Sequence, residues 1–253
     1  MKKLRLDHLI FERGLADSTS QAQRLVMAGL VYVNGQKSDK AGHKVLSTIE
    51  LEVRETLPFV SRGGLKLKGA LQYFSFPVQD AVALDVGAST GGFTDCLLQH
   101  GASKVYAVDV GHGQLHYKMQ QDERVINIEK THVRLLTPEI IPESVDILVM
   151  DTSFISLEKV LPPSWSFLKV GGWCVALIKP QFEVEPKHLK KGVVRDDDIR
   201  QWAVDKIVTF VKTHLDGVEV IGVTESPIHG PKGNVEFLLG LKKVARIRTF
   251  EKT

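Results

Sequence analysis

The stretch AVALDVGASTGGFTDCLLQ, residues 81–99, decides how this chain folds. It begins as an unbroken apolar run, which is typical of a strand buried on both faces. It then turns through glycines and continues with apolar residues at helical spacing, Phe93, Cys96 and Leu97. The pattern predicts a buried strand, a glycine-rich loop and a helix.

The loop between this strand and helix has the features of a nucleoside site. Three glycines allow its backbone to approach a ligand closely, Gly87, Gly91 and Gly92. Thr90 and Thr94 are expected to cap the helix and to present hydroxyl groups. A second apolar run, residues 105–108, ends in Asp109, about two dozen residues after Asp85, where a carboxylate can hold a ribose hydroxyl.

The motif D-V-G-A-S-T-G-G-F lacks both the G-x-G-x-x-G of dinucleotide sites and the G-K-[ST] of a P-loop. Its spacing resembles the S-adenosylmethionine loop of class I methyltransferases, although a tight strand-to-helix turn alone would also explain the glycines. The resemblance implies S-adenosyl-L-methionine as cofactor, bound by Asp85, Gly87, Ser89, Thr90, Gly91, Gly92, Phe93, Asp109 and Val110.

The composition is that of a globular protein with one large domain, or a medium domain and a small one. Its 253 residues are 43% hydrophobic, enough for a substantial core and unlike disordered or fibrous chains. Cys96 and Cys174 lie in apolar segments and match no metal spacing, so we expect buried thiols, no disulfide and no metal site. With neither a signal-peptide core nor a membrane-spanning apolar stretch, the sequence predicts a cytoplasmic protein without a membrane partner.

Positive charge is concentrated at the N-terminus. Residues 1–48 carry eight Lys or Arg and four Asp or Glu, a net +4, whereas the whole chain carries +3. This asymmetry favours contact between the N-terminal region and a polyanion. A solvated basic face would give the same charge pattern, and charge alone does not separate the two.

The N-terminal region predicts two short helices followed by a small sheet. Helical spacing over residues 6–13 ends at Gly14, and a second helix, capped by Ser18 or Ser20, ends at Gly29. Short strands are expected at residues 31–33, around residue 45 and at residues 49–53. A tight turn at Asn34-Gly35 follows the first of them.

Residues 5–45 resemble the RNA-binding domain of the ribosomal protein S-four type. The shared pattern is R-L-D-x-x-L, R-G, S-x-x-x-A and G-x-V-x-V-N-G. The resemblance implies RNA contact through the helix pair, with candidate phosphate contacts at Arg5, Arg13, Arg24, Lys37 and Lys40. Thr19 stands where that family usually has an arginine, which weakens one expected contact. We therefore expect an α+β RNA-binding domain over residues 1–53 and a linker over residues 54–59.

Residues 60–245 predict an α/β domain with a parallel, doubly wound sheet, since strands and helices alternate along them. A helix over residues 64–74 has Lys66 and Lys68 on either flank of its apolar stripe, and periodicity does not choose between them. A long helix over residues 197–214 is expected to turn four residues inward, Trp202, Ile207, Phe210 and Val211. The last two strands, near residues 218–223 and 235–241, are too close for a crossover and should be antiparallel. Residues 246–253 form a basic tail to which we assign no role.

Charged residues end several of the buried strands. Asp85, Asp151 and Lys179 each terminate an apolar run, and Glu236 lies within the last predicted strand, where an inward carboxylate needs a partner. One such residue is compatible with simple solvation, but several beside a glycine loop suggest a proton-transfer site for an alcohol. Lysine, with an ordinary pKa of about 10.4, acts as a base near neutrality only when desolvation or another cation lowers its pKa.

A second resemblance covers nearly the whole chain. The segments SRGGLKL, ALDVGASTGGFTD, YAVDVGHGQL, VMDTSFISL, ALIKPQFE, KGVVRD and SPIHGPKGNVEFLL are similar to the TlyA (hemolysin A-like) family. That family joins an S-four-type domain to an FtsJ-like class I (Rossmann-like) methyltransferase domain. The resemblance implies 2′-O-methylation of cytidine ribose in ribosomal RNA, free or in ribosomal subunits, by the tetrad Lys66, Asp151, Lys179 and Glu236. The context S-R-G-x-x-K selects Lys66 over Lys68, whereas His132 replaces an asparagine frequent in the family.

Three other functions are compatible with parts of the sequence. A base amino-group methyltransferase would carry [DN]-P-P-[YF] where residues 151–154 read Asp-Thr-Ser-Phe, so both prolines are missing. A carbon methyltransferase with a cysteine nucleophile would need a thiol beside that strand end, and neither cysteine is placed there. A haemolytic or purely RNA-binding protein would leave the tetrad unexplained. The oligomeric state stays open.

Overall fold

The computed structural model describes residues 3–53 and 58–245, and the chain divides into two compact units, Met1–Leu57 and Pro58–Thr253. Residues 54–57 of the predicted linker and the predicted tail, residues 246–253, lie outside the described residues. The remaining predicted linker residues, Pro58 and Phe59, belong to the second unit, where Phe59 is buried in the hydrophobic core.

The first unit packs two helices against short strands, as the sequence predicts. Helices α1 (Leu6–Glu12) and α2 (Thr19–Met27) are followed by left-handed glycines, and the hydroxyl of Ser18 caps α2 by accepting from the amide of Gln21. Their apolar faces form a core that includes Leu6, Ile10 and Val26. The strands pair as two small antiparallel sheets, β1 (Lys3–Arg5) with β4 (Lys44–Leu46), and β2 (Val31–Val33) between β3 (Gln36–Lys37) and β5 (Leu51–Val53).

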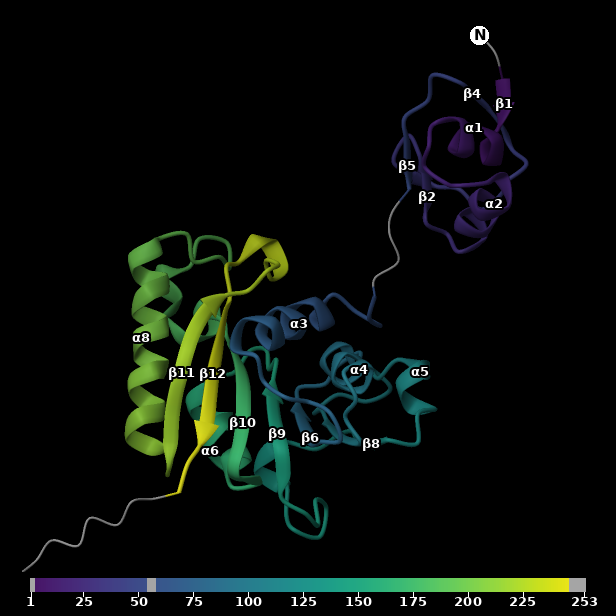
Figure 1. The fold of residues 1–253 in the computed structure, drawn as a ribbon. Helices are drawn as coiled ribbons and strands as arrows, with labels where there is room; N and C mark the ends of the chain where they lie inside the picture. The colour runs from purple at the N-terminus through teal and green to yellow at the C-terminus, as the bar shows by residue number, and fades with distance from the viewer. Residues whose placement is uncertain (1–2, 54–57, 246–253) are drawn as a thin grey trace, which may run out of the picture. The chain divides into compact units, whose positions relative to one another are not determined.

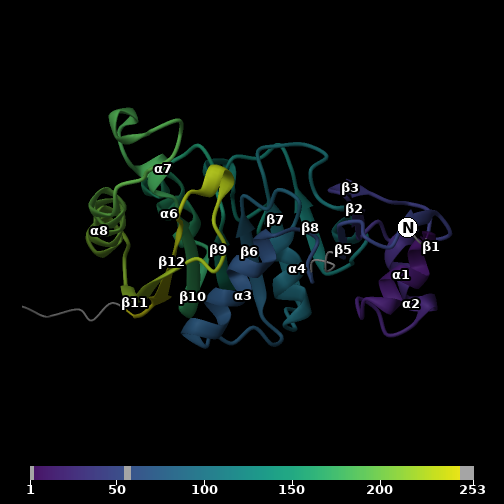
Figure 2. The same cartoon turned by 90° about the horizontal axis from the view of Figure 1, so that it is seen from above.

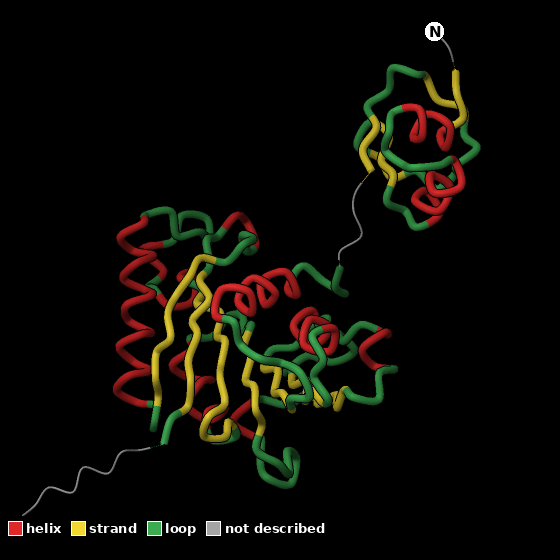
Figure 3. Tube along the Cα trace, in the orientation of Figure 1, coloured by secondary structure: helices red, strands yellow, loops and turns green. Residues whose placement is uncertain are grey.

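The second unit is built on a seven-stranded sheet in the order β11-β12-β10-β9-β6-β7-β8, which Figure 2 labels and Figure 3 draws in yellow. Its strands are β6 (Val82–Val86), β7 (Lys104–Val108), β8 (Val125–Ile128), β9 (Val145–Met150), β10 (Leu168–Ile178), β11 (Val218–Glu225) and β12 (Phe237–Lys243). Neighbours from β10 to β8 are parallel, whereas β12 runs antiparallel to both β10 and β11. The predicted α/β sheet and its antiparallel end are confirmed.

Helices cover both faces of this sheet (Figure 1, Figure 2). The helices of this unit are α3 (Gly63–Phe74), α4 (Gly92–Gln99), α5 (Tyr117–Gln120), α6 (Leu157–Trp165), α7 (Pro180–Glu183) and α8 (Asp197–His214), with 3₁₀ turns η1 (Val133–Leu135), η2 (Pro186–His188) and η3 (Pro231–Gly233). Because strand side chains alternate, Leu84 and Val86 join the core under α6 and α8, while Ala83 joins the core under α3 and α4. The carboxyl ends of the parallel strands therefore open between two helical layers.

Three local predictions were wrong. Helix α4 begins after the left-handed Gly91 without a side-chain cap, because the hydroxyl of Thr94 donates instead to Oδ2 of Asp85 at 2.7 Å. Trp202 is 52% exposed, since the buried stripe of α8 is formed by Ala203, Val204, Ile207 and Val211. Glu236 precedes β12 rather than lying within it.

Candidate active site

The four residues of the predicted tetrad meet at the carboxyl-end edge of the sheet. Asp151 follows β9 and Lys179 follows β10, so parallel strands bring both to one edge. Glu236 reaches the same edge because β12 is antiparallel and begins there, and Lys66 extends from α3 above it.

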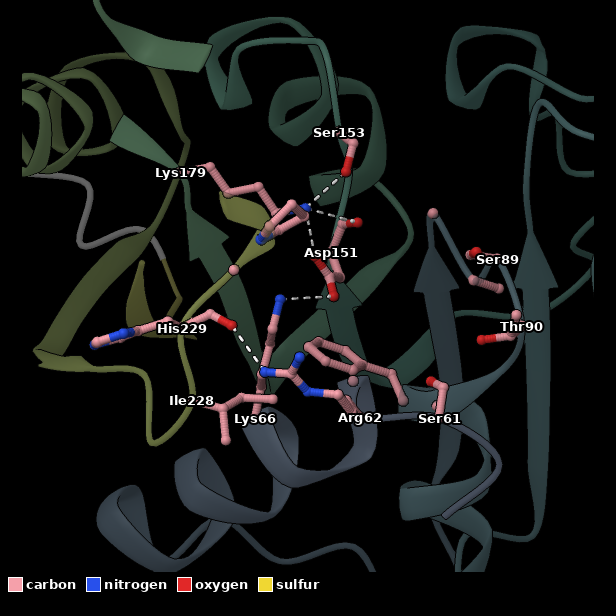
Figure 4. Close-up of a pocket in the computed structure, with 17 residues that line it drawn as sticks. Ser61, Arg62, Lys66, Ser89, Thr90, Asp151, Ser153, Lys179, Ile228 and His229 are labelled. Carbon is pink, nitrogen blue, oxygen red and sulfur yellow. Dashed lines mark hydrogen bonds and ion pairs between the residues drawn. The ribbon is translucent and has the colours of Figure 1, made fainter. Parts of the chain in front are cut away.

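The tetrad forms a continuous chain of ion pairs. Nζ of Lys66 lies 2.8 Å from Oε2 of Glu236 and 3.4 Å from Oδ2 of Asp151. Nζ of Lys179 lies 2.6 Å from Oδ1 of the same aspartate (Figure 4). Asp151 thus bridges the two lysines, and two positive charges are balanced by two negative ones.

Burial makes this balance necessary. The side chains of Lys66 and Lys179 are 9% and 7% exposed, and Glu236 is completely buried. A buried charge without a partner is strongly destabilising, so each member holds its neighbours in place. Asp151, at 20% exposure, is the most accessible of the four.

Two polar side chains outside the predicted site complete the network. The hydroxyl of Ser153 accepts a hydrogen bond from Nζ of Lys179 at 2.8 Å, and the amide of Gln181 donates to Oε1 of Glu236 at 3.1 Å. Both lie within two residues of a tetrad member in the sequence, but only the folded chain shows that their side chains turn toward it.

Two cavities adjoin the tetrad. The first, of about 310 Å³, exposes three tetrad members, Lys66, Asp151 and Lys179, together with Ser61, Arg62 and His229. Arg62 crosses this cavity, donating from Nη2 to the carbonyl of His229 at 3.1 Å (Figure 4). The second cavity, of about 500 Å³, is the more apolar, and its lining includes Val86, Val108, Asp109, Val110, Gln114, Thr131, His132, Phe154, Ile155 and Val160. The cavities share four lining residues, Gly87, Ser89, Asp151 and Ser153.

The glycine-rich loop forms a cradle between the cavities. Gly87 has φ +83°, and a Cβ there would lie 3.1 Å from Cα of Thr152 and 3.2 Å from the carbonyl oxygen of Asp151. Only glycine therefore fits this approach of two backbones. Asp109 fastens the loop, since its carboxylate accepts from the amides of Ser89 at 2.8 Å and Gly111 at 2.7 Å. Asp109 lines the second cavity, on the side of the loop where the sequence predicts the cofactor.

The predicted cofactor residues separate into four groups. Asp109 and Val110 line the second cavity alone, Thr90, Gly92 and Phe93 line the first alone, and Gly87 and Ser89 line both. Gly91 and Asp85 line neither. Asp85 lies beneath the loop with no exposed surface, and burial raises the pKa of its carboxyl from 3.8 to about 7. Its Oδ1 has no hydrogen-bond partner among the described residues.

Both cysteines are buried, as predicted, and neither is placed for nucleophilic chemistry. Burial raises the pKa of the Cys96 thiol to about 12 and also raises that of Cys174. Within residues 3–53 and 58–245, no group of His, Cys, Asp or Glu side chains is arranged to hold a metal ion. In the same ranges no helix has the length and apolarity needed to cross a bilayer.

The residues of the first unit that are predicted to contact RNA differ in whether they already form hydrogen bonds within the domain. Arg24, Lys37 and Lys40 are exposed. Arg5 makes two hydrogen bonds to the buried carboxylate of Asp7, at 3.0 and 2.7 Å, and Arg13 donates to the carbonyl of Ser47. Part of the hydrogen-bonding capacity of these two arginines is therefore used within the domain.

Comparison with known proteins identifies both units. Residues 59–243 match the FtsJ-like methyltransferase family, and residues 4–48 match the S4 domain. The 16S/23S rRNA (cytidine-2′-O)-methyltransferase TlyA of Mycobacterium tuberculosis is 42% identical over 244 residues, covering 95% of this chain and 90% of that protein.

Solved structures agree with these matches. A Streptococcus thermophilus protein that carries a hemolysin name is 44% identical, with a TM-score of 0.73 over 96% of this chain and 90% of its own. An O-methyltransferase from Bacillus cereus shares the fold alone, at 15% identity and a TM-score of 0.50 over 75% of this chain and 83% of that one.

The reversed strand beside β10, the glycine-rich loop after β6 and the family match over residues 59–243 define the class as an α/β methyltransferase with an added N-terminal domain. More particularly, the chain belongs to the FtsJ-like methyltransferase family, and its N-terminal unit is an S4 domain. Both sequence-based family predictions are confirmed.

Proposed function

We propose that this protein methylates the 2′-hydroxyl of cytidine in ribosomal RNA, with S-adenosylmethionine as methyl donor. The observation that carries the proposal is the Lys66–Asp151–Lys179–Glu236 network, placed where two cavities share a wall. The name of the M. tuberculosis relative, which specifies this reaction, supports it.

The second cavity would hold the cofactor, with Asp109 near the ribose of the cofactor. Gly87 would lie beside the cofactor, in the wall that the two cavities share. S-adenosylmethionine bound there would supply an electrophilic methyl group. The first cavity would then hold the target nucleotide, against Lys66 and Lys179.

The reaction forms an oxygen–methyl bond and releases the proton of the 2′-hydroxyl. In this mechanism Lys179 first releases a proton to solvent and then accepts the proton of the 2′-hydroxyl; in support, its side chain lines the first cavity and contacts Ser153, which lines both cavities. Asp151 and Ser153 hold the resulting ammonium, while Lys66, paired with Glu236, fixes the opposite oxygen of Asp151. General-base catalysis of this kind typically contributes about a hundred- to ten-thousandfold.

The S4 domain supplies the affinity for RNA in this proposal. Its exposed Arg24, Lys37 and Lys40 provide positive charge suited to phosphates, in the region that carries net +4. This division of labour leaves the chemistry to the second unit.

The test is to incubate the purified protein with labelled S-adenosylmethionine and with ribosomal RNA or subunits from cells that lack the gene. The RNA is then digested to nucleosides, which are separated and identified by mass spectrometry. We expect 2′-O-methylcytidine, lost in Lys66→Ala and retained in Lys68→Ala, a matched change two residues away on α3. A methyl group on the base would contradict the proposal and favour an amino-group or carbon methyltransferase.

A further inference from the structure

Gln181 is a polar residue two positions after Lys179. Unlike Lys179, it does not line the first cavity. It lies in α7, directly after Lys179-Pro180, and is only 9% exposed. Its Nε2 donates to Oε1 of Glu236 at 3.1 Å, a bond between two buried groups. Neither cavity is lined by Gln181, so it does not reach substrate or cofactor.

The carboxylate of Glu236 is enclosed on all sides. It has no exposed surface, and its two oxygens have separate partners: Oε2 faces Lys66, and Oε1 faces Gln181. The backbone of Gly230 approaches Oε1 so closely that a Cβ there would collide with it. Gln181 is thus the sole side-chain donor to Oε1 among the described hydrogen bonds, and Glu236 itself lines neither cavity.

These contacts close a ring through the site. Gln181 bonds Glu236, Glu236 pairs with Lys66, Lys66 with Asp151, and Asp151 with Lys179, which lies two residues from Gln181 in the chain. Pro180 at the start of α7 restricts the backbone between the two ends. We propose that Gln181 is a positioning residue for catalysis: it fixes the rotamer of Glu236 and thereby aims Lys66 at Asp151. This inference rests on the proposed function of the tetrad.

An amide suits this position for a physical reason. It is a neutral donor, so it satisfies a buried carboxylate without adding charge to a network that already balances. A carboxylate at residue 181 would face Glu236 with a like charge, and an apolar chain would leave Oε1 unpaired. Hydrogen bonds to charged groups are the stronger class, so losing this one should be costly.

The test compares methyl transfer to RNA by the full-length wild type, Gln181→Met and Gln181→Glu. We expect kcat to fall on the order of tenfold to a hundredfold in Gln181→Met and further in Gln181→Glu, with KM for RNA and cofactor little changed. Gln201→Met is the matched control, because exposed Gln201 also donates to a carboxylate, that of Asp205 at 2.9 Å, and neither residue lines a cavity beside the tetrad. It should keep wild-type kcat.

A double-mutant cycle separates positioning from general support of the fold. If Gln181 acts through Glu236, then adding Gln181→Met to Glu236→Met should change kcat by no more than about twofold, since the oxygen that accepts from Gln181 is already absent. Losses of kcat that multiply would overturn the proposal.

A crystal structure of Gln181→Met gives a readout that does not depend on activity. We expect the Glu236 carboxylate to rotate and Nζ of Lys66 to leave Asp151. An unchanged Glu236–Lys66–Asp151 arrangement would overturn the inference even if the wild type methylates RNA. Conversely, a displaced Lys66 in a protein that methylates no RNA would retain the positioning role and refute only the proposed function.

Discussion

Asp85 contributes to the pH dependence of the stability of the second unit, and replacing it with asparagine should remove that contribution. The carboxyl has no exposed surface, and burial raises its pKa from 3.8 to about 7. Between these values the unfolded chain has released the proton while the folded chain retains it. The unfolded state then binds fewer protons, so the free energy of unfolding decreases as pH rises.

The size of the effect follows from the two pKa values. Each pH unit in this window removes about 1.4 kcal/mol, and the decrease stops above the folded-state pKa. From pH 5 to pH 8 the contribution of Asp85 falls by about 3 kcal/mol. The side chain introduced by Asp85→Asn is neutral in both states, so this variant should become more stable relative to wild type by about that amount over the same range.

Urea unfolding followed by tryptophan fluorescence measures this difference directly. All three tryptophans, Trp165, Trp173 and Trp202, lie in the second unit, so the signal reports that unit. The exposed Asp205→Asn serves as control and should follow the wild-type pH profile. Parallel profiles for wild type and Asp85→Asn between pH 5 and 8 would refute the assignment of a buried, protonated Asp85.

Three further outcomes are expected. Asp109→Ala should weaken S-adenosylmethionine binding, measured by calorimetry, about tenfold or more. The reason is that the carboxylate of Asp109 lines the second cavity and accepts hydrogen bonds from the amides of Ser89 and Gly111. Unchanged affinity would exclude Asp109 from the cofactor site. Removing residues 1–53 should weaken RNA binding and reduce its dependence on salt. The slope of the log binding constant against log salt concentration should fall by roughly 0.7 to 0.9 for each phosphate that is no longer bound. An identical slope would place RNA binding elsewhere. Lys179→Arg should be as inactive as Lys179→Ala with RNA affinity retained, because guanidinium stays protonated; an active arginine variant would exclude Lys179 as the base.

Much of the fold could be predicted because its signals are local. The run from residue 82 to 99 specifies strand, loop and helix through apolar periodicity and glycines, and α8 has the predicted bounds because acidic residues begin it and the apolar stripe ends with it. Helix α6 was not predicted, since Pro162 and Pro163 lie inside it. Its first turn is stabilised by Glu183, 26 residues further along the chain, whose carboxylate accepts a hydrogen bond from the amide of Leu157 at 2.9 Å.

The site was predictable to the level of strand ends but not of side-chain contacts. Charged residues after buried runs indicated Asp151 and Lys179, whereas periodicity left Lys66 and Lys68 equivalent until a family resemblance separated them. The structure buries Lys66 beside Glu236, a contact between residues 170 apart in sequence. Gln181 has no sequence signal of its own, because its role depends on which way a four-residue helix turns it.

The most direct test of the central claim uses RNA whose target cytidine, once mapped, is replaced by 2′-deoxycytidine. The substitution removes only the oxygen that the tetrad is proposed to activate and keeps the base unchanged. Methyl transfer from labelled S-adenosylmethionine is measured on this RNA and on the matched ribose form, with binding of both to the protein measured in parallel. We predict equal binding and no transfer to the deoxy substrate. Transfer to the deoxy substrate at the rate of the ribose form would contradict 2′-O-methylation.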